Sequence, residues 1–304
     1  MEKMINAYRI ESISQAHKLF DLPKPLHPLI SLVDTSAITI DLSILPNPHV
    51  LPFYKISYRA KLSGKLKYGQ GYYDFDEGGL LFAAPNQVVG SHEDNGDNSG
   101  YILLIHPDFL LGSPLSKKIK QYGFFSYTAN EALHLSDKER ETIITIFKII
   151  EEKLNSRIDD FSQDVILSQV ELLLNYANRF YKRQFITRKA VSNDLLQKIE
   201  EITDNYFANE TTIRQGTPTV QYLAEQVHLS PGYLSDMLRS LTGQNAQQYI
   251  HSLLIEKAKE KLSTTGLSVS EIAYELGFEH SQSFSKLFKT KTKLSPLEFR
   301  QSFN

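Results

Sequence analysis

The feature of this sequence that most restricts its fold is an internal repeat in the last third of the chain. Val220–Val227 matches Val269–Leu276 at its apolar positions, at an offset of 49, and a small alanine occupies the same place in each copy. A second matching pair follows at an offset of 50, formed by Leu234–Arg239 and Phe284–Lys289. A repeat of this length indicates two copies of one small supersecondary unit.

Each copy has the residue pattern of a helix-turn-helix. Ala224 and Ala273 leave room for two helices to cross at a steep angle, as that motif requires. Gly277 suits a left-handed turn, whereas His228 at the equivalent position adopts a left-handed backbone less readily. Apolar residues on one face of each second helix predict burial, which leaves the opposite face free to enter a groove. A single pattern of this kind also occurs at ordinary helical corners, but two at matched spacing favour a DNA-binding pair.

The residues between the two copies predict a connecting helix. Gln247–Leu262 covers 16 residues, or about 24 Å at ~1.5 Å per residue. The second helix of each copy is the reading (recognition) helix. A rigid connection of that length is able to hold the two reading helices in successive major grooves, which lie about 34 Å apart. The predicted partner is therefore double-stranded DNA.

Residues from about Asp194 to Asn304 resemble the DNA-binding domain of the AraC/XylS family of bacterial transcription regulators. The motifs that carry the resemblance are Leu-Ala-Glu and Leu-Ser-Pro-Gly-Tyr-Leu-Ser within 223–235, Glu-Ile-Ala-Tyr-Glu-Leu-Gly-Phe at 271–278, Phe-Ser-Lys-Leu-Phe-Lys at 284–289 and Ser-Pro-Leu-Glu-Phe-Arg at 295–300. The resemblance implies two helix-turn-helix units joined by a helix, with a sensor domain upstream. It also makes RNA polymerase a candidate partner.

The sequence departs from that family's pattern at several positions. The family usually has Gly in place of His228 and Lys293, Phe in place of Leu238, and Arg in place of Leu254. Asp236 places an acid on the exposed face of the first reading helix, where it opposes phosphates. These departures keep an alternative open, namely a ligand-independent scaffold or anti-regulator with weakened DNA binding.

The residues expected to contact DNA lie on the predicted solvent faces of the two reading helices. On this basis Gln282 is a candidate reader of adenine, Arg239 a candidate reader of guanine, and Lys289 a phosphate anchor. The full predicted set is Gly232, Ser235, Asp236 and Arg239 in the first copy and Ser281, Gln282, Ser285, Lys286 and Lys289 in the second.

The first 130 or so residues have the pattern of a small β domain. Tyr54–Leu62 alternates strictly, with Tyr54, Ile56 and Tyr58 on one face and charged residues on the other. Leu80–Ala84 and Tyr101–Ile105 predict further strands, separated by turn residues. These strands indicate a small antiparallel barrel or sandwich, and the resemblance to the AraC/XylS family implies an α+β protein with an N-terminal, cupin-like antiparallel β-barrel. The alternation also predicts that Lys55 and Arg59 face solvent.

Helical patterns follow the predicted barrel. Ser136 and Glu139 form a capping-box signature, and apolar stripes then mark two helices within 136–185. This helical pair could cover the barrel or join two subunits, and the apolar run at Leu172–Leu174 favours a homodimer. The expected organisation is a sensor and dimerisation domain at 1–185 (barrel 1–130, helices 136–185), a linker at 186–193 and a DNA-binding domain at 194–304.

Composition narrows the function classes. The 304 residues contain no cysteine, which removes disulfides, thiolate zinc sites and cysteine nucleophiles. The net charge of −2 is nearly neutral, but Ser281–Asn304 has five basic residues against one acid. No hydrolase, metalloprotease, P-loop or dinucleotide motif is present, so we expect no enzyme activity and no cofactor. No apolar run is long enough for a membrane span, which predicts a cytoplasmic protein.

The sensor domain offers aromatic rather than metal-ligating candidates. His49 is the one histidine in its predicted strand region, so we expect a loop residue there and no metal. Tyrosine combines an apolar ring with a hydrogen-bonding tip, which suits a small-molecule effector of unknown identity. The candidate ligand residues are Tyr54, Tyr58, Tyr72 and Phe82, and filling the barrel core is the alternative role for each of them. The predicted function is a sequence-specific DNA-binding transcription regulator controlled by that effector.

Overall fold

The computed structural model describes residues 8–36, 49–61, 65–68, 71–74, 78–89, 99–128, 131–156, 162–187, 189–208 and 211–302. The chain divides into two compact units, Met1–Gln184 and Phe185–Asn304. Each unit has its own core. Of the helices that the structure describes, none combines the length and the hydropathy of a membrane-spanning segment.

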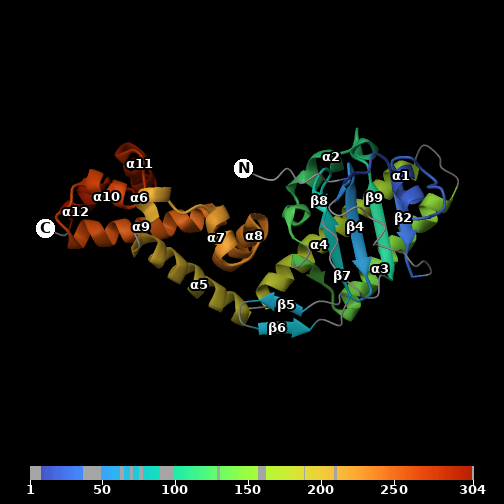
Figure 1. Cartoon of the computed structure of the whole chain (residues 1–304), viewed down its shortest axis with the longest axis horizontal. Coiled ribbons are helices and arrows are strands. Elements are labelled where there is room, and N and C mark those ends of the chain that lie inside the picture. The colour runs from blue at the N-terminus through green and yellow to red at the C-terminus, as the bar shows by residue number, and fades with distance from the viewer. Residues whose placement is uncertain are drawn as a thin grey trace. The chain divides into compact units, whose positions relative to one another are not determined.

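The first unit contains short strands followed by two long helices (Figure 1). The strands are β1 (Tyr8–Arg9), β2 (Ile30–Asp34), β3 (His49–Val50), β4 (Tyr54–Arg59), β5 (Lys65–Tyr68), β6 (Gly71–Asp74), β7 (Gly79–Ala83), β8 (Val88–Val89), β9 (Gly100–Ile105) and β10 (Leu133–His134). The helices are α1 (Ile13–Leu19), α2 (Leu115–Lys118), α3 (Asp137–Asn155) and α4 (Ser162–Thr187), and 3-10 turns lie at Pro107–Leu110, Ile119–Gln121 and Gly123–Ser126.

The described strands form three sheets rather than one closed barrel. The largest has the order β10-β7-β4-β9-β2 with antiparallel neighbours, β1-β3-β8 is a second sheet, and β5-β6 is a hairpin. The β1–β3 pair is parallel, which differs from the antiparallel expectation. Short strands punctuated by turns are typical of barrels and of several small sheets alike, so the pattern could not tell them apart. The cupin-like barrel is therefore not confirmed.

One face of the five-stranded sheet packs against helices and aromatic turns. Tyr54, Ile56 and Tyr58 are buried on this face, as the alternation predicted. Tyr101 on β9 stacks on Phe147 of α3 with ring centroids 5.3 Å apart, and Tyr54 meets Phe125 edge-on at 5.0 Å. The tyrosine face of β4 is thus the inner core of the unit.

The opposite face of the same sheet is covered as well, which the sequence did not predict. A second apolar cluster joins Ile10, Ile13 and Ala16 near the chain start to Leu51, Phe53 and Leu104. Lys55 on this face is half-buried and Ser57 is buried, so the expectation that the charged face of β4 meets solvent was wrong for its central part. The cover comes from α1, more than 30 residues away along the chain, and the local alternation of β4 holds no information about it.

The two long helices form where the apolar stripes placed them. Ile143, Phe147 and Ile150 of α3 are fully buried, as are Val170 and Leu173 of α4. The Ser136 backbone N–H donates to Glu139 at 2.9 Å, which is one half of the predicted capping box. The segment 186–193, which we expected to be a linker, is largely helical: α4 ends at Thr187, and the next helix begins at Lys189. A helix needs an apolar stripe only where it packs, and good helix formers such as Lys and Ala suffice elsewhere.

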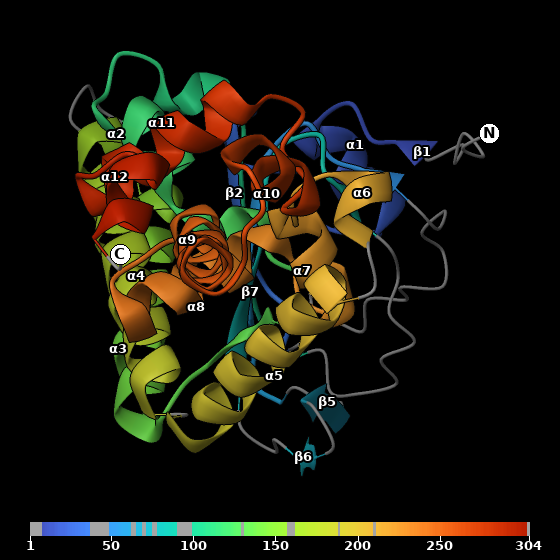
Figure 2. The ribbon, with the colours of Figure 1, turned by 90° about the vertical axis from the view of Figure 1, so that its left-hand side faces the viewer.

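The second unit is entirely helical in its described part. Its helices are α5 (Lys189–Ala208), α6 (Thr211–Gln215), α7 (Val220–Gln226), α8 (Pro231–Thr242), α9 (Ala246–Thr264), α10 (Val269–Glu275), α11 (Ser281–Thr292) and α12 (Pro296–Gln301). The predicted connecting helix is α9, and its 19 residues span about 28 Å. Figure 2 looks almost along its axis. Helices α8, α10, α11 and α12 all contact α9, so α9 is the central helix, or spine, on which the unit packs.

Candidate functional site

The two helix-turn-helix units are α7–α8 and α10–α11, and each has a well-defined start. The Thr219 and Ser230 side chains cap α7 and α8 by accepting from the backbone N–H three residues on. Ser268 and Glu271 form a full capping box at α10. Such caps satisfy backbone donors that are otherwise unpaired at the first turn. The second helix of each unit is 12 residues long.

The cores beneath the reading helices match the prediction from the repeat. Ala224 and Ala273 are fully buried at the crossing points, together with Leu234 and Leu238 in the first unit. Phe284 and Phe288 replace that leucine pair in the second unit and are also fully buried. Their rings continue a chain of aromatic contacts from Phe278 to Phe299, with centroids 5.4–5.8 Å apart. The second reading helix thus rests on a larger aromatic base.

The turns confirm the backbone requirement that the sequence suggested. Gly277 has φ 87°, and His228 at the matching position has φ 58°. A Cβ on Gly277 would lie only 2.5 Å from the Gly216 backbone, so this turn needs glycine for space as well as for conformation. The same relation holds after the reading helices, where Gly243 has φ 75° and Lys293 has φ 68°. Two of these four left-handed positions therefore carry a side chain that the conformation disfavours.

The first reading helix, α8, presents a nearly neutral face. Arg239 is exposed, but its guanidinium donates to Asp236 at 3.0 Å, one turn earlier. The Ser235 hydroxyl accepts from the Ala246 backbone N–H at 3.4 Å, so it supports the start of α9. Gly232 is half-buried. Of the four residues predicted to contact DNA in this copy, Arg239 is thus the exposed one, and the Asp236 carboxylate compensates its positive charge.

The second reading helix, α11, presents a basic face. Gln282, Lys286 and Lys289 are exposed, whereas Ser281 and Ser285 are half-buried. Another nearby cation serves the fold, because the Arg300 guanidinium donates to the Leu262 and Leu267 carbonyls at 3.3 and 2.6 Å. Not every basic residue within 281–304 is therefore available to bind an anion. The lysines on α11 are exposed and remain available.

Comparisons with known proteins agree with this geometry. Residues 223–302 match the family described as a helix-turn-helix domain. Over 141 residues the chain is 30% identical to the HTH-type transcriptional activator RhaS of Salmonella newport, and the same holds for RhaS of Salmonella agona. The alignment covers 46% of this chain and 46% of each relative, so the chain spans about half the length of the curated relatives it matches. The C-terminal unit is thus similar to the helix-turn-helix part of these transcription activators.

Similar solved structures cover the same region. The C-terminal domain of the response regulator yesN from Fusobacterium nucleatum is 36% identical, with a TM-score of 0.29, and the match covers 33% of this chain and 95% of that one. The C-terminal domain of AraT, a response regulator from Geobacillus stearothermophilus, is 28% identical with a TM-score of 0.31, covering 36% of this chain and 84% of that one.

Two departures from the AraC/XylS pattern have a structural account. Leu254, where the family usually has Arg, is 2% exposed in α9, so this position is part of the core. Leu238, where the family usually has Phe, is fully buried under α8. Both changes therefore act on packing rather than on the surface that faces outward.

The N-terminal unit places the predicted ligand residues in its core. Tyr54, Tyr58 and Phe82 are buried on the helix-facing side of the sheet, where Phe82 contacts Phe124 and Phe125 at centroid distances of 4.4 and 5.5 Å. Tyr72 lies on β6, and its side chain is outside the described residues. Burial raises the pKa of the Tyr54 and Tyr58 hydroxyls, as expected for rings enclosed by apolar neighbours.

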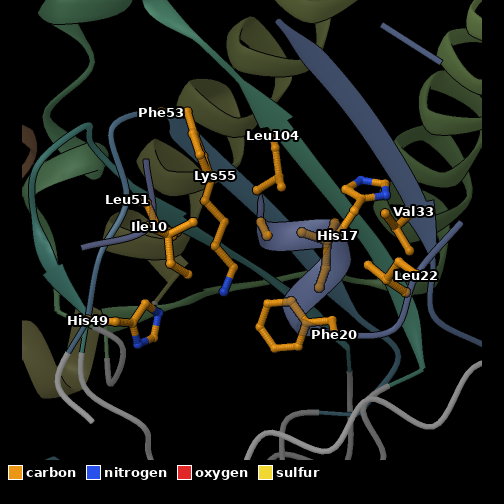
Figure 3. Close-up of a pocket in the computed structure, with 12 residues that line it drawn as sticks. Ile10, His17, Phe20, Leu22, Val33, His49, Leu51, Phe53, Lys55 and Leu104 are labelled. Atoms are coloured by element: carbon orange, nitrogen blue, oxygen red, sulfur yellow. The ribbon is translucent and has the colours of Figure 1, made fainter. Parts of the chain in front are cut away.

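A pocket lies on the other face of the sheet, and the sequence reasoning missed it. Figure 3 shows the residues that line it, which come from α1, β2, β3, β4 and β9 and from the chain between them. The polar members are His17, His49 and Lys55. His49 is buried in β3, not in a loop as expected. The described residues include no group of three His, Asp or Glu side chains placed to hold a metal ion. The face of β4 that carries Lys55 also carries Ser57 and Arg59, so its sequence contained no signal of a pocket.

Proposed function

We propose that this chain is a sequence-specific DNA-binding transcription regulator whose N-terminal unit binds a small-molecule effector. The single observation that carries the proposal is the pair of capped helix-turn-helix units on one spine, each with a reading face turned away from its core. The proposal has α8 and α11 entering two successive major grooves of one duplex. The predicted contact set, from Gly232 to Lys289, is part of this proposal.

The two reading faces support different roles. Lys286 and Lys289 of α11 are exposed, and the ion pairs found among the described residues do not include them, although Lys289 lies near enough to Glu298 to act on its carboxylate. Such cations supply the phosphate term, which is independent of sequence and sensitive to salt. On α8, Asp236 compensates Arg239. The second unit therefore provides most of the electrostatic affinity, and Arg239 reads a base only after it leaves Asp236.

Salt-dependent binding to a library of duplexes tests the proposal. Lys289→Ala should weaken all sequences alike and reduce the slope of log affinity against log salt by about one. Gln282→Ala should relax preference at one base position, at a cost of roughly 1–3 kcal/mol on the preferred site. Lys259→Ala, which removes a half-buried cation on α9 that is already paired with Glu256 at 2.7 Å, is the control with an expected smaller slope change. An unchanged base preference for Gln282→Ala would remove that residue from the reading surface.

Asp236→Asn separates a regulator from the alternative function. Removal of the carboxylate frees Arg239 and removes repulsion from phosphates, so affinity should rise by several-fold at low salt. The Asp236–Arg239 pair is the observation that keeps a scaffold or anti-regulator in view. If the wild-type chain binds no duplex at low salt and Asp236→Asn does not restore binding, the chain is a scaffold of that kind.

We also propose a homodimer formed through α4. Leu172 is 40% exposed and Val165 is 39% exposed, one heptad apart on the same face of that helix. Apolar residues at this spacing are typical of a helix that packs against another helix. Leu173 and Leu174 are buried in the unit itself, so the candidate dimer surface is narrower than the predicted run Leu172–Leu174.

A further inference from the structure

We propose that the pocket between α1 and the sheet binds a small monocarboxylate, whose charged end pairs with the Lys55 ammonium while its short apolar body fills the space around it. This inference rests on the proposed function only in treating the N-terminal unit as an effector-binding domain. It assigns the chemical class of the ligand and the residue that recognises it.

Strand register brings Lys55 into the pocket. On β4 it pairs with Ala83 of β7 and Leu104 of β9, and the Leu104 side chain lines the same space. Figure 3 shows the Lys55 side chain reaching between Ile10, Phe20 and His49, with its nitrogen at the end of the apolar wall. A lysine stem packs well along such a wall, but the ammonium requires a partner.

Within the described residues, no carboxylate pairs with Lys55. The ion pairs of the N-terminal unit involve Lys118, Arg140, Lys153, Arg183 and His106 instead. The charged group that acts on Lys55 is Arg59, a second cation on the same strand. An anion is therefore favoured in this pocket, and a cation is repelled.

The two histidines define the rest of the polar lining. His17 on α1 is committed to the fold, since Nδ1 lies 2.5 Å from the Pro23 carbonyl oxygen and Nε2 lies 2.7 Å from the Ser31 hydroxyl. The carbonyl only accepts, so Nδ1 carries a proton. His49 is buried on β3 at the side of the pocket. Lys55 is the lining residue that supplies an ammonium group, which makes it the partner for an anion.

Size and polarity restrict the ligand further. The cavity is about 50 Å³, which holds a few water-sized groups and no large molecule. Apart from Lys55 and the two histidines, every lining residue is apolar. A phosphate or a dicarboxylate would leave a second charge without a partner, at a high desolvation cost. A single carboxylate on a short aliphatic body satisfies both conditions.

Titration of Lys55 gives the binding a definite pH dependence. Burial, assisted by Arg59, lowers the pKa of Lys55 to about 8. The carboxylate binds the protonated amine, so affinity should be constant from about pH 6 to 8, fall about tenfold per unit above pH 8, and fall again at low pH where the ligand is protonated. The other titratable or charged groups near Lys55 in the described part are His17, His49 and Arg59.

The test uses the full chain, with propionate and butyrate as probes and propionamide and butyramide as their neutral counterparts. Calorimetry at pH 7 should show each acid binding roughly tenfold to a hundredfold tighter than its amide. Lys55→Met should abolish that preference. Lys61→Met, an exposed lysine beyond the end of β4, is the matched control and should retain it.

Three results would overturn the inference: no acid binds, the acids and amides bind equally, or Lys55→Met keeps the preference. A ¹³C-methyl label on the lysines reports the pKa of Lys55, which should rise when butyrate binds. DNA binding is measured separately. Carboxylate binding without any DNA binding would refute the proposed regulator and leave the pocket assignment intact. DNA binding that responds to neutral compounds alone would support the regulator and refute the carboxylate assignment.

Discussion

At the residue scale, the turn before α8 has the less favourable backbone of the two helix-turn-helix units. His228 adopts φ 58° and its side chain is exposed, so the left-handed conformation brings no packing in return. His228→Gly removes the steric penalty, while glycine's greater freedom in the unfolded state offsets part of the gain. We expect stabilisation of the C-terminal unit by roughly 0.5–1 kcal/mol, measured by scanning calorimetry of the full chain.

The matching turn of the second unit supplies the control. Gly277→Ala should destabilise by more than about 2 kcal/mol, because the new Cβ meets the Gly216 backbone in addition to the strained φ. A gain in stability for His228→Gly beside a loss for Gly277→Ala would show that both turns favour a residue suited to the left-handed conformation. A loss of stability in His228→Gly would mean that the imidazole makes a compensating contact.

Lys55 provides a pH-dependent prediction at the same scale. Its pKa is about 8 in the folded chain against an ordinary value of 10.5 for an exposed lysine. Between these values the unfolded state binds more protons, so this group's destabilising effect is complete below pH 8 and fades as the pH rises to 10.5. Lys55→Met should therefore stabilise the ligand-free protein at pH 7 and much less at pH 10. Urea unfolding at both pH values checks this, and equal gains would contradict it.

At the element scale, the long helices and the repeat were predictable from sequence because their periodicity records their own burial. The stripe on α3 and the pairs Leu234/Leu238 and Phe284/Phe288 all proved buried. The alternation of β4 correctly identified one buried face, but it held no information on what covers the other. That cover comes from α1 and Ile10, and the pocket that includes Lys55 forms between distant segments. The candidate ligand site could therefore not be located from local pattern, whereas the reading helices could.

The Arg183 side chain of α4 contacts both α3 and β10. The Arg183 guanidinium donates to both oxygens of Glu139 at 3.1 and 2.6 Å and to the His134 carbonyl at 2.9 Å. Arg183→Met removes all three bonds and leaves a half-buried carboxylate, at an expected cost of about 2–3 kcal/mol. Arg140→Met breaks an exposed pair with Asp137 and should cost less than about 0.5 kcal/mol. Chemical denaturation of both variants measures the difference, and equal costs would contradict the role of Arg183.

At the scale of the whole molecule, the arrangement of copies determines how DNA is engaged. A dimer brings two pairs of reading helices to one duplex, so the second pair binds at a high effective concentration once the first is seated. The apolar positions Val165 and Leu172 on α4 are the proposed contact, and they lie in the unit that does not carry the reading helices. A mutation on α4 should therefore change the oligomeric state without changing the affinity of one chain for a single half-site.

Leu172→Glu should convert the dimer to a monomer, because a charge in the centre of an apolar helix contact loses hydration without gaining a partner. Thr145→Glu, at an exposed position on α3 and away from Val165 and Leu172, is the control and should leave the dimer intact. Light scattering at tens of micromolar measures the mass. Affinity for a duplex with two half-sites should fall with Leu172→Glu, while affinity for a single half-site stays unchanged. A wild-type chain that is monomeric under these conditions, or a Leu172→Glu variant that remains dimeric, would rule out the α4 interface.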